Sequence, residues 1–301
     1  MTRSTALLIG LLVLITVSAV SCGKDADELG TGEFIRVVTT TYPLAFMTER
    51  IGGDRVAITQ LVKPGVEAHD FEPAPSDVLS ISRADVFIFN HPSFEGWALN
   101  AVTASSSGGN GSAVAVQTID SEADDSSFDA HVWLNPVKAQ LQAQRILAAL
   151  ISADPDGTTD YERNAAVLKE DLQALDDLIS ARLSSCDLAY VVVSHLAFGH
   201  MAERYNFDQI GLAGLSPEFE SGPSHLAGVI EQMNSLGVRY ILQEPIVSDR
   251  LAETIAAETG AELLDLHPLE VRTSSEAAAG KDYFAIMQAN AESLAIALAC
   301  S

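Results

Sequence analysis

The sequence predicts an α/β protein with two mostly parallel four-stranded sheets, each flanked by helices, and one long helix that joins the two halves. Three observations favour this class. Short β-branched runs alternate with segments of helical spacing, the alternation occurs in two sets of four, and a long amphipathic stretch separates the sets. Alternation of strands and helices is typical of parallel sheets that are covered on both faces.

The eight predicted strands are short runs rich in Val, Ile, Leu and Phe. They cover Phe34–Val38, Val56–Leu61, Asp85–Phe89 and Ala113–Val116 in the first half, and Ala189–Val193, Phe207–Ile210, Val238–Leu242 and Glu262–Leu264 in the second half. Runs of this length and composition suit strands that are buried within a sheet. Each half therefore has enough strands for a small sheet of its own.

The residues after Gly157 predict the connecting helix. Apolar or small side chains recur there every three or four residues over about 25 residues, which places them on one stripe of a helix. They are Tyr161, Ala165, Leu168, Leu172, Leu175, Ile179 and Leu183. A helix longer than average indicates a connector, so we expect lobes at 34–155 and 186–301 with a linking helix at 156–185. The alternative is one more surface helix in a single doubly wound domain.

Residues 1–21 predict an export signal. Arg3 precedes an apolar run from Ala6 to Val20, which as a helix spans about 22 Å, less than the roughly 30 Å of a bilayer's hydrocarbon core. The sequence Ala19-Val20-Ser21-Cys22 is similar to a bacterial lipobox, so we expect Cys22 to carry a lipid and 22–33 to form a polar tether. The mature protein is then extracytoplasmic and anchored to the cell membrane. An ordinary secretory signal is the alternative.

Two cysteines, Cys186 and Cys300, remain for the folded chain. An even number of cysteines in an exported protein suggests a disulfide bond, with two free thiols as the alternative. The bond would close a loop of more than 100 residues. In the chain-entropy model such a loop stabilises the folded state by about 4 to 5 kcal/mol.

The charge balance excludes one class of partner. The 301 residues include 17 Lys+Arg and 41 Asp+Glu, which leaves a net charge of −24. Nucleic-acid binding needs a basic face, so we expect no nucleic-acid partner. The acidic excess favours encounter with cations. The acidic segment Asp120–Asp129 lacks the central glycine of an EF-hand loop, and we interpret it as a solvated loop.

Four of the seven histidines follow predicted strands: His69, His131, His195 and His267. Loops at the carboxyl ends of parallel strands form the ligand crevice of open α/β sheets, so two histidines from each half could meet there. Three or four imidazoles in one site suit Zn²⁺ in tetrahedral geometry. Spacing alone is weak evidence, because a single histidine in a loop is more often a surface or core residue.

The motifs around these histidines add a more specific signal. In chain order they are Pro64-Gly65-x-x-x-His69-x-x-x-Pro73, Phe94-Glu95-x-Trp97, His131-x-Trp133-Leu134-Asn135-Pro136, Ser194-His195-x-Ala197-Phe198, Gln243-Glu244-Pro245 and His267-Pro268-Leu269-Glu270. Over about Phe34 to Ala299 the chain resembles the metal-binding lipoproteins that serve as substrate-binding components of bacterial zinc and manganese ABC transporters. The resemblance implies two α/β lobes joined by a rigid long helix.

The resemblance also implies metal ligands. The family's metal-ligand positions correspond to His69 and His131 in the first lobe and to His195 in the second. Manganese-binding members tend to have a carboxylate at position 195, so the imidazole here implies Zn²⁺. The fourth position commonly reads Asp-Pro-Leu in the family, whereas this chain has His267-Pro268-Leu269. We expect His267 as the fourth ligand, with Asp265 or water as alternatives.

Taken together, these expectations describe a monomeric receptor that is not an enzyme. It would capture Zn²⁺ between its lobes and deliver it to an ABC permease in the cytoplasmic membrane. Mn²⁺ or Fe²⁺ is the alternative cargo. From other classes, a metal-binding adhesin is one alternative, and a zinc-dependent hydrolase with Glu67 as general base is another. The sequence offers no separate motif for an organic substrate of such a hydrolase.

Overall fold

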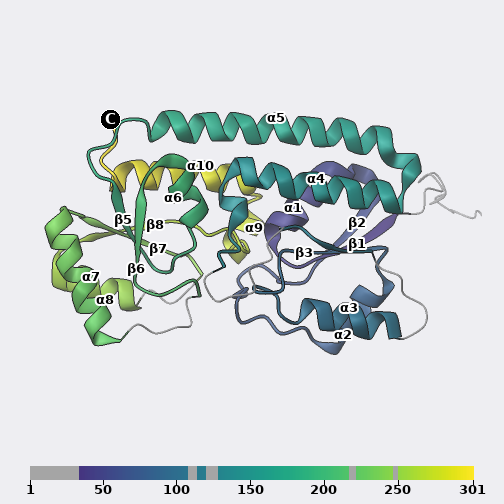
Figure 1. Ribbon diagram of the computed structural model, residues 1–301, viewed down its shortest axis with the longest axis horizontal. Helices are drawn as coiled ribbons and strands as arrows, with labels where there is room; N and C mark the ends of the chain where they lie inside the picture. The colour runs from purple at the N-terminus through teal and green to yellow at the C-terminus, as the bar shows by residue number, and fades with distance from the viewer. Residues whose placement is uncertain (1–33, 108–113, 120–127, 217–221, 247–249) are drawn as a thin grey trace, which may run out of the picture. The chain divides into compact units, whose positions relative to one another are not determined.

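Two parallel four-stranded sheets organise the protein in the computed structural model (Figure 1). The structure describes residues 34–107, 114–119, 128–216, 222–246 and 250–301. The expected signal, Cys22 and the tether lie outside these residues, as does most of the acidic segment. Among the described residues, none of the helices has the length and apolar character needed to cross a membrane.

The first sheet has the strand order β2-β1-β3-β4, and its neighbouring strands are all parallel. Its strands are β1 (Ile35–Thr39), β2 (Val56–Gln60), β3 (Val86–Phe89) and β4 (Val114–Gln117). Its helices are α1 (Tyr42–Gly52), α2 (Pro75–Arg83), α3 (Ala98–Ser107) and α4 (Pro136–Ala153). Side chains alternate across a strand, so Val86 and Ile88 join the core with α1 and α4, whereas Phe87 and Phe89 face α2 and α3. Burial on both faces explains the continuous apolar run of β3.

The second sheet repeats this pattern with the order β6-β5-β7-β8, again with parallel neighbours. Its strands are β5 (Tyr190–Val193), β6 (Asp208–Gly211), β7 (Tyr240–Gln243) and β8 (Glu262–Asp265). Its helices are α6 (Gly199–Tyr205), α7 (Pro223–Leu236), α8 (Arg250–Thr259), α9 (Ser274–Ala278) and α10 (Tyr283–Ala297). Val192 packs in the cluster with α7 and α8, whereas Val191 and Val193 pack in the cluster that contains α10. The predicted fold class is therefore confirmed.

The long helix is α5 (Thr158–Arg182), which has 25 residues. It packs on α4 and α1, which cover the first sheet, and on α10, which covers the second (Figure 1). Its predicted stripe supplies Leu168, Leu172 and Ile179 to the same buried core. The helix is confirmed, and the lobe boundaries at 155 and 185 stay a prediction.

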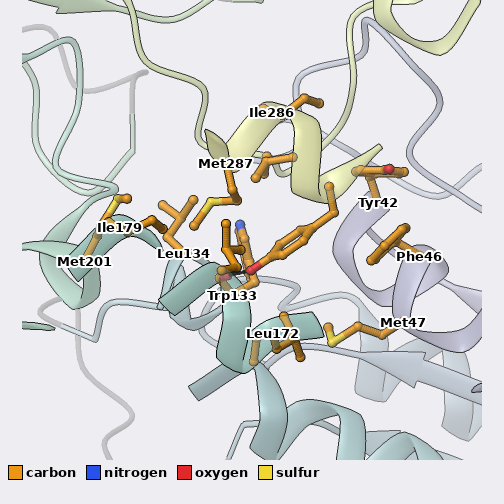
Figure 2. Close-up of a cluster of buried hydrophobic side chains, with 14 of the residues drawn as sticks. Tyr42, Phe46, Met47, Trp133, Leu134, Leu172, Ile179, Met201, Ile286 and Met287 are labelled. Carbon is orange, nitrogen blue, oxygen red and sulfur yellow. Dashed lines mark hydrogen bonds between the residues drawn. The ribbon is translucent and has the colours of Figure 1, made fainter. Parts of the chain in front are cut away.

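Figure 2 shows this shared core around Trp133. Side chains come from α1 (Tyr42, Phe46, Met47), the 3₁₀ turn Val132–Leu134, α5 (Leu172, Ile179), α6 (Met201) and α10 (Ile286, Met287). The Trp133 indole is fully buried, and its Nε1 donates a hydrogen bond to the carbonyl of Pro268 at 2.7 Å. Because Trp133 lies two residues after His131, this packing fixes a loop that carries a candidate ligand.

The second half begins and ends at one disulfide bond. Cys186 follows α5 and is bonded to Cys300, which follows α10. The same two residues also form an antiparallel bridge. The bond links positions 114 residues apart, as the cysteine count predicts.

Asp176 ties α5 to α6, and this contact predicts a pH-dependent stability. The buried carboxylate accepts hydrogen bonds from Arg204 Nε at 2.9 Å, Arg204 Nη2 at 2.6 Å and Tyr205 Oη at 3.0 Å. The Arg204 hydrogen bonds hold the pKa of this carboxyl below its ordinary value. We expect Asp176→Asn to lower the free energy of unfolding by about 2 kcal/mol at pH 7, because charge-assisted hydrogen bonds are lost.

The stabilisation by Asp176 has a defined pH window. Because the pKa is lower in the folded state, the contribution is present above the unfolded carboxyl pKa of roughly 4 and is lost as the pH falls through the folded value. The difference between parent and variant in urea unfolding should therefore shrink from pH 7 to pH 3. Asp171→Asn, which removes the more exposed pair with Arg50, should have an effect below about 1 kcal/mol. A constant difference for Asp176→Asn across this range would contradict the assignment.

Candidate metal centre

Four side chains from four separate loops meet in one buried site. His69 follows β2, His131 follows β4, His195 follows β5 and Glu270 follows β8. All of these strands are parallel to their neighbours, so their carboxyl ends lie at one edge of each sheet. The topology therefore explains how residues far apart in the sequence reach the same place.

The three imidazoles converge on one carboxylate oxygen. Glu270 Oε1 lies 2.9 Å from His131 Nε2, 3.1 Å from His69 Nε2 and 3.6 Å from His195 Nε2. One ligand atom from each residue lies within 4.8 Å of all the others. His131, His195 and Glu270 are buried and His69 is partly buried. The arrangement can hold a single cation with three nitrogen ligands and one oxygen ligand.

Carboxylates outside this group orient two of the rings. His131 Nδ1 lies 2.8 Å from Asp129 Oδ1, and His195 Nδ1 is hydrogen-bonded to Glu244. A proton held on Nδ1 in this way leaves the Nε2 lone pair directed into the site. His195 Nε2 is buried and has no hydrogen-bond partner among the described residues. A metal ion in the site would satisfy this nitrogen.

The electrostatic surroundings favour positive charge at the site. Burial alone would raise the pKa of Glu270, but the histidines around it hold that pKa well below its ordinary value. Burial likewise opposes protonation of His195, yet Glu244 and Glu270 raise its pKa to about 10. The pKa of His131 is also raised, because Asp129 and Glu270 outweigh the effect of burial. Burial raises the pKa of Glu67, and the nearby Glu270 and Glu244 add to that effect.

Aromatic rings enclose the group on one side. The Phe94 ring packs edge-on against His69 with centroids 4.8 Å apart, and Trp133 packs edge-on against His131 at 5.3 Å. Apolar walls keep competing water away from a bound ion and strengthen its electrostatic interactions. Phe94 and Trp133, which both belong to the motifs found in the sequence, thus line the site.

The structure does not bring His267 or Asp265 into this group. His267 Nδ1 accepts a hydrogen bond from the Leu269 amide at 2.9 Å, and its Nε2 is hydrogen-bonded to Glu276 Oε2 at 3.1 Å. Both ring nitrogens are thus engaged within the protein. Asp265 ends β8 at an exposed position, where it accepts a hydrogen bond from Gln243. The fourth member of the group is instead Glu270, three residues after His267 in the same loop.

The signal for Glu270 was present in the motif His267-Pro268-Leu269-Glu270. We predicted the first residue of that motif, His267, as the fourth ligand. The carboxylate three residues later lies in the same loop, and the backbone turns it toward the histidines. Asp129, the last residue of the acidic segment predicted to be solvated, is instead bonded to His131, and 120–127 lie outside the described residues.

The two parallel sheets and the site of three imidazoles and one carboxylate define an α/β protein of the metal-binding class. The family model for the periplasmic zinc-uptake complex component A, ZnuA, matches residues 37–297. The chain belongs to this zinc-uptake family.

Named relatives agree with this membership. The chain is 34% identical over 295 residues to the high-affinity zinc uptake system protein ZnuA of Bacillus subtilis, covering 91% of this chain and 92% of that one. It is 31% identical to the zinc-binding lipoprotein AdcA of Streptococcus pneumoniae, covering 97% of this chain but 60% of that protein's length. The crystal structure of the Zn(II)-bound ZnuA-like domain of the same AdcA matches with a TM-score of 0.78 and 30% identity, over 88% of this chain and 99% of that domain.

Proposed function

We propose that this protein binds Zn²⁺ through His69, His131, His195 and Glu270 and delivers it to an ABC permease. The observation that carries the proposal is the convergence of three Nε2 atoms and one carboxylate oxygen within 4.8 Å of one another in a buried site. Membership of the zinc-uptake family supports the cargo and the role. The name of the Bacillus subtilis relative, a high-affinity zinc uptake protein, supports both as well.

The donor set favours Zn²⁺ over Mn²⁺ and Fe²⁺. Three imidazole nitrogens and one carboxylate oxygen suit a tetrahedral zinc site, whereas Mn²⁺ prefers oxygen ligands and lies lower in the affinity series. Because only one ligand carries a negative charge, the bound ion keeps a net positive charge. Asp129 and Glu244, which hold the Nδ1 atoms of His131 and His195, offset that charge.

The same donor set favours capture of an ion over catalysis. A catalytic zinc site usually has three protein ligands and an open position for water or substrate. Four protein ligands fill a tetrahedral shell and leave no such position. We therefore propose a receptor and not a zinc hydrolase.

Export and anchoring complete the proposal. The segment 1–21 is proposed to direct export, and Cys22 to carry a lipid that holds the protein at the outer face of the cytoplasmic membrane. The relative AdcA is named as a lipoprotein, which supports this placement. We propose that the folded chain consists of the lobes 34–155 and 186–301 with the linking helix 156–185 between them. We also propose that the protein is a monomer.

Metal titration of the purified chain tests the proposal. Elemental analysis after loading is expected to give one zinc per chain, and competition with a chromophoric chelator is expected to give tighter binding of Zn²⁺ than of Mn²⁺. Binding should weaken as the pH falls, because imidazole binds metal only when it is neutral and the nearby carboxylates raise the pKa values of His131 and His195. Tighter binding of Mn²⁺, or no stoichiometric binding of either ion, would contradict the proposed cargo.

A further inference from the structure

The backbone beside Glu270 adopts a conformation that its residue type disfavours. Leu269 has a φ of 62°, in the left-handed region, and its side chain is fully buried. A bulky residue rarely adopts this conformation, because Cβ comes too close to the following carbonyl oxygen. Such a conformation persists only where the surrounding structure holds it in place.

The side chain of His267 supplies one of the contacts that hold this turn. Its Nδ1 accepts the hydrogen bond from the Leu269 amide at 2.9 Å, two residues along the chain. Its Nε2 donates to Glu276 Oε2 at 3.1 Å. Glu276 is held in turn by the amide of Thr273 at 3.0 Å and by Thr273 Oγ1 at 2.8 Å, in the capping box of α9. The start of α9 thereby fixes the orientation of the imidazole that receives the Leu269 N–H.

Other elements fix the rest of the same turn without the His267 ring. Asn290 of α10 exchanges two hydrogen bonds with the backbone of His267, each 2.8 Å long. The Pro268 carbonyl accepts from Trp133, and the Glu270 carbonyl accepts from the Tyr42 amide at 2.9 Å. The Leu269 amide differs from these groups, because it donates its hydrogen bond to the His267 side chain. Loss of that side chain should disturb the turn locally and leave its two ends in place.

We infer that His267 is a positioning residue for Glu270. By accepting the Leu269 N–H, it keeps the left-handed turn that points the Glu270 carboxylate at His69, His131 and His195. This inference rests on the proposed function, because it requires Glu270 to be a zinc ligand. It gives His267 a role in zinc binding without contact with the ion.

Zinc affinity of a set of variants tests the inference. His267→Ala, and His267→Leu, which retains volume at this buried position, should each weaken zinc binding by about 10- to 100-fold. His267→Asn should retain most of the affinity, because an Asn side-chain oxygen can accept a hydrogen bond from the amide two residues on. His225→Ala is the matched control. His225 lies in the first turn of α7, and its ring bonds to the Gly211 carbonyl. The zinc affinity of this variant should equal that of the parent.

A double variant separates positioning from direct ligation or general destabilisation. In a Glu270→Ala background, His267→Ala should cause no further loss of zinc affinity, because both changes remove the same interaction. Additive losses would overturn the inference, as would His267→Ala and His267→Leu proteins that bind zinc as tightly as the parent. Equal losses in His267→Asn and His267→Ala would also overturn it. A parent chain that binds no zinc would contradict the proposed function itself, and this outcome is distinct from all of the others.

Discussion

His195→Ala is expected to weaken zinc binding by about a hundredfold to a thousandfold. A four-ligand zinc site supplies roughly 10 to 16 kcal/mol of apparent binding free energy, so an equal share for one ligand is about 2.5 to 4 kcal/mol. His195 is fully buried, and its Nε2 has no protein hydrogen-bond partner among the described residues. Its removal also leaves the buried Glu244 without its imidazole partner. Competition of the metal-loaded protein with a chromophoric chelator measures the change.

The control for this experiment is another histidine of the second half. His225→Ala should bind zinc as the parent does, which shows that the loss does not follow from removing any imidazole. Far-UV circular dichroism of the metal-free His195→Ala protein should match that of the parent. If the His195→Ala protein instead titrates with zinc as tightly as the parent, the ligand assignment is wrong.

Removal of the disulfide bond is expected to give the largest change in stability. Cys186 and Cys300 close a loop across a separation of 114 residues. In the chain-entropy model a cross-link over a loop of this length stabilises the folded state by about 4 to 5 kcal/mol, because it restricts the unfolded chain. The Cys186→Ser/Cys300→Ser protein should therefore unfold at a markedly lower urea concentration. Zinc affinity at low urea should not change, because neither cysteine belongs to the metal site.

Reduction of the parent protein provides the matching control. Urea unfolding of the parent with a strong reductant should approach the curve of the double serine variant, and the variant itself should be insensitive to the reductant. Equal urea midpoints for the oxidised parent and the variant would contradict a stabilising role for the bond.

The strands could be predicted because their composition is distinctive, whereas their ends could not be placed as well. The run Val191–Val193 forms the last three residues of β5, within the predicted strand. Val238 was predicted as the start of a strand, but β7 begins at Tyr240. Gly237 ends α7 with a φ of 72°, and the amide of Val238 still bonds to the carbonyl of Met233. Val238 therefore lies in the turn after α7 and before β7, although its β-branched side chain favours a strand.

The three histidines of the site could be predicted from the sequence, whereas Glu270 could not. The chain has only seven histidines, so several of them at predicted strand ends are a distinctive pattern. It has 41 acidic residues, so a single carboxylate in a loop is not distinctive. Glu270 follows a left-handed turn at Leu269, and no residue preference predicts such a turn at leucine. The structure places His267 outside this group, because its ring bonds to the Leu269 amide two residues away and to Glu276.

The four proposed ligands lie far apart along the chain, so a bound ion should stabilise the fold and protect the protein against proteolysis. His69 and Glu270 are 201 residues apart, so an ion bound to both cross-links most of the folded chain. A ligand that binds the native state alone stabilises it by about 4 kcal/mol when its concentration is a thousand times its dissociation constant. The metal-free form is therefore expected to unfold more often and to be cleaved faster by proteases. Scarcity of zinc would therefore shorten the survival of the empty receptor, while each captured ion protects its carrier until delivery.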